Sequence, residues 1–119
     1  MSNPYNDTVQ PMAPTEFLSL TYKMMLKRID RLIEIENSKK RGKLPLPLLK
    51  EKAEITSKLL KAIHLIGDSF DYTKDIGELL DIFNDFGIIL GEANLSDDSK
   101  VILEKYRICK IILEGFLDI

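Results

Sequence analysis

The chain contains one cysteine and one histidine among its 119 residues, and both scarcities restrict its chemistry. Cys109 has no second thiol with which to form a disulfide within the chain, and its place on an apolar helical stripe predicts a small core residue. A di-metal site in a helical bundle needs Glu-x-x-His pairs, but Lys61 occupies the glutamate position before His64. Glycine-rich phosphate loops and calcium loops are also missing. We therefore expect no catalytic residues, no metal, no cofactor and no enzymatic activity.

Long apolar runs are absent as well. The uninterrupted apolar stretches extend over only a few residues, far fewer than the roughly 18 that a membrane-spanning helix needs. The N-terminus lacks the charged region and the apolar region of a signal peptide. Together with the lone cysteine, these absences predict a protein of the reducing cytoplasm that does not insert into membranes.

Charge is divided unevenly along the chain. Residues 23–61 carry 12 of the 17 Lys and Arg residues but 5 of the 19 acidic residues, a balance of +7. From residue 62 onward there are 5 basic and 12 acidic residues, a balance of −7. We interpret this division as two halves of one fold that attract each other rather than as a nucleic-acid surface. The basic segment has no aromatic residues that could stack on bases.

Apolar residues recur at helical spacing in four segments, about 14–38, 47–69, 72–94 and 97–118. Pro14 and Pro47 suit the first positions of their helices, where a missing N–H costs nothing, and Ser96 is placed to cap the last helix. The expected inward stripes are Phe17, Leu18, Met25, Ile29, Leu32, Ile33 and Glu36 in the first helix and Leu49, Ala53, Thr56, Leu59, Leu60, Ile63, Ile66 and Phe70 in the second.

Four helices joined by short connections predict an all-α fold, an antiparallel up-down four-helix bundle that occupies residues 14–119. Residues 38–46, broken by Gly42 and Pro45, are expected to form a basic loop. Residues 1–13 contain two prolines among small polar residues and are predicted to be a flexible, extended N-terminal arm. The apolar anchors of this arm are Tyr5, Val9 and Met12.

The last two helices carry more apolar surface than one core needs. The third helix has the inward stripe Leu79, Leu80, Phe83, Phe86, Gly87 and Leu90, and the fourth has Ile102, Tyr106, Cys109, Ile112, Leu113 and Phe116. A second stripe lies beside each of them, so either the helices bury wide faces or they frame a groove for a partner helix. The residues predicted to bind a partner are Ile82, Phe86, Ile89, Val101, Ile108 and Ile111.

Two short runs resemble a known family. Residues 13–22, Ala-Pro-Thr-Glu-Phe-Leu-Ser-Leu-Thr-Tyr, resemble the opening of the FliS family, the flagellin-specific export chaperones. Residues 90–98, Leu-Gly-Glu-Ala-Asn-Leu-Ser-Asp-Asp, resemble the turn between the last two long helices of that family. The chain departs from the family pattern at Lys23 and Met24, where an acid and a glycine usually follow, which indicates a divergent member.

The resemblance implies a cytoplasmic four-helix chaperone. Such a protein binds the disordered C-terminal segment of flagellin, prevents premature polymerisation and delivers the flagellin to the export gate of the flagellar type III apparatus, alone or with a co-chaperone. It also implies a role for Tyr5, Val9 and Met12, which would cover the groove in the free protein and move aside for the client.

Two alternatives to the chaperone stay open. One is a helical adaptor or homodimer whose spare apolar stripes meet a second copy of the chain, with no export role. The other is nucleic-acid binding through the basic loop at residues 39–43. It is the weaker alternative, because five residues on a loop supply charge without base readout.

Overall fold

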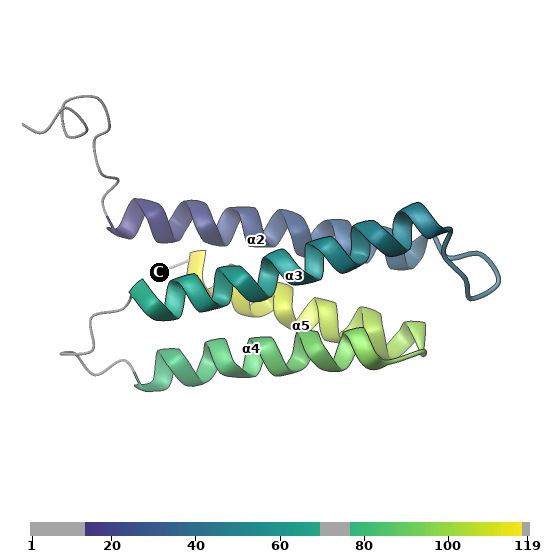
Figure 1. Ribbon diagram of the computed structural model, residues 1–119. Coiled ribbons are helices and arrows are strands. Elements are labelled where there is room, and N and C mark those ends of the chain that lie inside the picture. The colour runs from purple at the N-terminus through teal and green to yellow at the C-terminus, as the bar shows by residue number, and fades with distance from the viewer. Residues whose placement is uncertain (1–13, 70–76, 118–119) are drawn as a thin grey trace, which may run out of the picture.

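The computed structural model describes residues 14–69 and 77–117, and these residues form four helices (Figure 1). They are α2 (Pro14–Asn37), α3 (Leu46–Ser69), α4 (Gly77–Leu95) and α5 (Ser99–Leu117). The predicted all-α four-helix bundle is confirmed. The arm anchors Tyr5, Val9 and Met12 lie outside the described residues, as does the predicted start of the third helix at residues 72–76.

The helices form a closed ring in which each packs against the next along the chain and α2 packs against α5. The α2 and α5 helices run antiparallel: Glu36 near the end of α2 accepts a hydrogen bond from Ser99 at the start of α5, and Tyr22 stacks on Phe116 at the opposite end. The contacts of α5 with α2 and α4 are the most extensive, and those of α3 with α4 are the least. The last helix, α5, therefore holds the bundle together.

The core consists of one apolar face from each helix. The α5 face follows the predicted stripe, since Ile102, Tyr106, Cys109 and Leu113 are at most 1% exposed. From the other three helices the largest fully buried side chains are Met25, Ile29, Leu32, Ile35, Leu59, Ile66, Phe86 and Leu90.

The buried face of α3 differs from the prediction. Leu49, Ala53 and Leu60 were expected inside and are exposed, and Ile55, which was not predicted, is buried. Leu59 and Ile66 are buried as predicted, and Phe70 lies outside the described residues. Because α3 makes the least extensive contact with α4, it buries a narrower face than its apolar residues would allow. At the start of α2, Phe17 was likewise expected inside and is 39% exposed.

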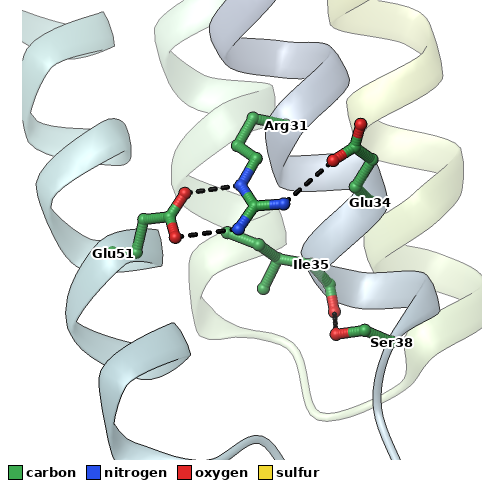
Figure 2. Close-up of polar contacts among 5 residues, drawn as sticks. All are labelled: Arg31, Glu34, Ile35, Ser38 and Glu51. Carbon is green, nitrogen blue, oxygen red and sulfur yellow. Dashed lines mark hydrogen bonds and ion pairs between the residues drawn. The ribbon is translucent and has the colours of Figure 1, made fainter.

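An arginine fork joins α2 to α3 on the surface. The Arg31 guanidinium donates from Nε and Nη2 to the two carboxylate oxygens of Glu51, at 2.5 and 2.9 Å, and from Nη1 to Glu34 at 2.9 Å (Figure 2). The hydrogen bonds from Arg31 hold the pKa of the Glu51 carboxyl below its usual value. This bidentate geometry fixes the relative position of the two helices more firmly than a single contact would.

The ion pairs do not follow the division of the chain into a basic and an acidic half. Most of the ion pairs in the described residues join two groups of the same half. The pair that joins the two halves has its cation in the acidic half and its anion in the basic half, because Lys110 binds Asp30 at 2.8 Å. Helix register decides which charges meet, and net charge acts only at long range, where salt screens it. The expected attraction between halves is therefore not what pairs these side chains.

The connection between α2 and α3 is a tight reversal. Lys40 and Lys43 exchange two backbone hydrogen bonds of 3.1 Å, and the residues between them, Arg41 and Gly42, have φ values of 56° and 72°. Two consecutive left-handed residues are typical of a type I′ turn. Glycine adopts this conformation without cost, whereas Arg41 adopts it against its preference.

The start of α5 is capped by Asp98 and not, as predicted, by Ser96. The Asp98 Oδ1 accepts the backbone N–H of Lys100 at 2.9 Å, and the Asp98 carbonyl accepts the first helical bond from Ile102 at 2.9 Å. The Ser96 hydroxyl accepts the N–H of Asp98 at 3.1 Å, so it orders the turn before the cap. Because α5 begins at Ser99, the side chain directly before it is the one that reaches the free N–H groups.

Replacing Asp98 with alanine is expected to lower the free energy of unfolding by about 1 kcal/mol, because it removes the cap and a negative charge from the helix N-terminus. Urea denaturation followed by circular dichroism measures the change. Ser96→Ala is the control and should cost less. A larger loss for Ser96→Ala than for Asp98→Ala would contradict this assignment.

Candidate functional site

An apolar groove runs along the surface between α4 and α5. Its exposed members include Ile111, which is 68% exposed, and Ile82, which is 39% exposed, while Ile89 and Ile112 are half-buried at its base. Apolar side chains left in water at this level usually mark a binding surface when they are contiguous. The α4/α5 groove is lined by Ile82, Asp85, Ile89, Ile111, Ile112, Gly115 and Phe116.

The structure brings together three of the six residues predicted to bind a partner. Ile82 and Ile89 come from α4 and Ile111 comes from α5, and all three line the groove. Val101 and Ile108 are half-buried on α5 and are not among the lining residues.

Phe86 was predicted for both the core and the partner surface, and only the core assignment is right. Its side chain is 1% exposed and belongs to the buried cluster. The α4 helix packs between α3 and α5, so the arc that carries Phe86 faces the interior. Phe86 is therefore not accessible from the surface.

Four of the residues that line the groove were not predicted from the sequence to bind a partner. Ile112 and Phe116 fell on the inward stripe of α5, and they do contact the core, but each sits at its edge and also faces the groove. Asp85 is polar, so the spacing of apolar residues did not indicate it. A side chain built at Gly115 would meet nothing within 4 Å, so this position leaves the α5 wall open.

The two ends of the groove are defined by different contacts. At one end Phe116 stacks on Phe83 and Tyr22, with ring centroids 4.9 and 5.1 Å apart, which ties α5 to α4 and α2. Toward the other end the Lys105 ammonium bonds to the Glu92 carboxylate at 3.0 Å and bridges α5 to α4. Because Val101 lies one turn beyond Lys105, this bridge separates it from the groove.

A second hollow lies on the other side of α4, against α3. It is lined by Leu60, Ile63, His64, Phe83, Asn84, Gly87 and Ile88. A side chain built at Gly87 would meet Ile63 Cδ1 at an ordinary 3.9 Å, and one built at Gly91 would meet nothing within 4 Å. Two of its lining residues, His64 and Asn84, are polar, against Asp85 alone in the α4/α5 groove, so the α4/α5 groove is the stronger candidate.

The buried titratable groups Glu36, Tyr106 and Cys109 lie in the interior of the bundle and do not line the α4/α5 groove. Burial raises the pKa of the Cys109 thiol to about 12, so it is protonated and unreactive at neutral pH. Burial, followed by the nearby Glu36 charge, raises the pKa of Tyr106. Glu36 is buried too, and it pairs with Lys39 and with Lys52, whose Nζ lies 3.8 Å away.

Within residues 14–69 and 77–117, no three His, Cys, Asp or Glu side chains gather closely enough to hold a metal ion. None of the described helices is long and apolar enough to cross a membrane. No protein-family model matches the chain, and neither does any curated protein or solved structure.

Changing Ile111 to aspartate is expected to alter the free energy of unfolding by less than about 0.5 kcal/mol, as at most surface positions. Leu113→Ala, two residues away and fully buried, should cost about 2–5 kcal/mol through the cavity it leaves. Urea unfolding of the two variants makes the comparison. An equal loss of stability would place Ile111 in the core and would remove it from the binding surface.

Proposed function

We propose that the chain is a non-enzymatic export chaperone. It binds the disordered C-terminal segment of a flagellin in the cytoplasm, prevents premature polymerisation and delivers the flagellin to the flagellar type III export apparatus. The observation that carries this proposal is the α4/α5 groove, because Ile82 and Ile111 leave apolar surface exposed on helices that already supply a full core. The resemblance to the FliS family supplies the identity of the client.

The groove suits the apolar face of an amphipathic helix. From Ile82 to Ile89 its α4 wall advances by seven residue steps, or about 10 Å at 1.5 Å per residue. Two turns of a client helix span this length and would place side chains at i, i+3 or i+4, and i+7 between the walls. The remainder of the client segment contacts other surfaces or stays in solvent.

A client segment that folds as it binds forms a complex of moderate affinity, from which it can dissociate. Ordering the segment typically consumes about 2–5 kcal/mol of the interaction energy, so the complex is weaker than its buried area would imply. Release at the export gate then needs competition for the segment and no nucleotide hydrolysis. This agrees with the absence of a phosphate-binding loop from the sequence.

Calorimetric titration with a peptide of about 40 residues from the C-terminus of flagellin of the same organism tests the proposal. We expect one-to-one binding, a negative heat-capacity change and a gain of helix. Ile89→Asp and Ile111→Asp should each weaken binding about 10- to 100-fold, the equivalent of one buried isoleucine.

Leu95→Asp is the matched control for these variants. Leu95 is an exposed apolar residue of α4, 85% accessible, that does not line the groove, so binding should be unchanged. No binding at tens of micromolar by the unmodified chain would refute the chaperone proposal. An equal loss for Leu95→Asp would place the client elsewhere on α4.

We also propose that the arm anchors Tyr5, Val9 and Met12 cover the groove in the free protein. Deleting residues 2–12 removes this internal competitor, so the affinity for the flagellin peptide should rise. The same titration measures the effect, with circular dichroism as a check on the fold. An unchanged affinity would exclude the arm from the binding cycle.

The second candidate, a homodimeric adaptor, is favoured by apolar surface outside the groove. Phe17, Leu20 and Met24 follow one face of α2 and are 39, 48 and 46% exposed. Sedimentation equilibrium distinguishes the two functions. A concentration-dependent mass that is lost on Met24→Asp, together with no affinity for the flagellin peptide, would replace the chaperone with the adaptor.

A further inference from the structure

The α4 wall of the groove has an acidic border. The helix contains four acidic residues and no lysine or arginine between Gly77 and Leu95. Asp81, Asp85 and Glu92 recur at intervals of four and seven residues, so they share one stripe beside Ile82 and Ile89. We call these three residues the acidic border, and Asp85 itself lines the groove.

Two of the three carboxylates have no charge partner within the described residues. Glu92 is bound by Lys105 at 3.0 Å. Asp81 and Asp85 are exposed, and neither takes part in an ion pair within residues 14–69 and 77–117. Within the described residues nothing neutralises their negative charge, which can act on whatever lies in the groove.

The opposite wall does not repeat this charge. The α5 helix carries four basic residues, Lys100, Lys105, Arg107 and Lys110, and two acidic ones, Glu104 and Glu114. Lys105 and Lys110 are already paired with Glu92 and Asp30. The groove thus has one uniformly negative edge, along α4, and one edge of mixed sign, along α5.

We propose that the groove selects an amphipathic helix whose apolar stripe is bordered by Lys or Arg on the edge that lies against α4. The inference rests on the proposed function for the use of the groove as a docking site and adds the chemistry of the occupant. Cations spaced by one turn match Asp81 and Asp85, which are also one turn apart. A helix bordered by Glu or Asp would set like charges opposite each other, so the border rejects it.

The test compares two labelled 18-residue peptides with the same apolar stripe, one bordered by lysines and one by glutamates. Fluorescence anisotropy with the full chain measures both affinities at low and at physiological salt. We expect the lysine peptide to bind about tenfold more tightly at low salt, because two exposed attractions replace two repulsions. Added salt should reduce the difference.

Two double variants locate the source of the preference. Asp81→Asn with Asp85→Asn should remove most of the preference for the lysine peptide. Glu54→Gln with Asp97→Asn changes net charge equally at exposed carboxylates away from the α4/α5 groove, so it should leave the preference intact. Circular dichroism establishes that both variants fold.

The outcomes separate this inference from the proposed function. Equal affinity for the two peptides, no binding of either, or an equal effect of the control variant would overturn the charge preference. None of these results depends on flagellin. Failure of the flagellin peptide to bind, with the lysine preference retained, would instead refute the export role and leave a groove for basic amphipathic helices.

Discussion

The buried stripe of α5 is the contact on which the rest of the structure depends. Ile102, Tyr106, Cys109 and Leu113 are almost completely buried, and α5 makes the most extensive contacts with both α2 and α4. Because this stripe is the face that α5 contributes to the core, the apolar residues on the adjacent arc of α5, Ile111 above all, stay at the surface. The groove therefore results from the way in which α5 packs into the core, and its other wall is α4, which packs against α5.

Two further clusters fix the ends of the bundle. At the end of α2 the buried Glu36 carboxylate joins three segments through Lys39, Lys52 and Ser99. A charge in that position is stable only with its partners, because removing one would leave it buried and uncompensated. At the opposite end an aromatic stack of Tyr22, Phe83 and Phe116 joins α2, α4 and α5. The groove begins at this stack, because Phe116 belongs to the stack and also lines the groove.

In the proposed function, the apolar groove and the acidic border contribute differently to recognition of the client. Burial of apolar side chains supplies most of the binding free energy and discriminates poorly among amphipathic helices. Charge along one edge adds little affinity but rejects helices with an acidic flank and speeds the encounter with basic ones. A chaperone for a disordered client benefits from both, since the client must be found quickly, held moderately and released.

The sequence by itself determined the four helices and the inward stripe of α5, because a 3.6-residue period fixes the angle at which each side chain leaves its helix. Only the tertiary structure decided which angles face a neighbour. In the structure Phe86 is buried, Leu60 is exposed, and Ile112 and Phe116 line the groove. Val101 lies beyond the salt bridge between Lys105 and Glu92. Those outcomes depend on where the adjacent helices lie and how closely they pack, which the period of one helix does not contain.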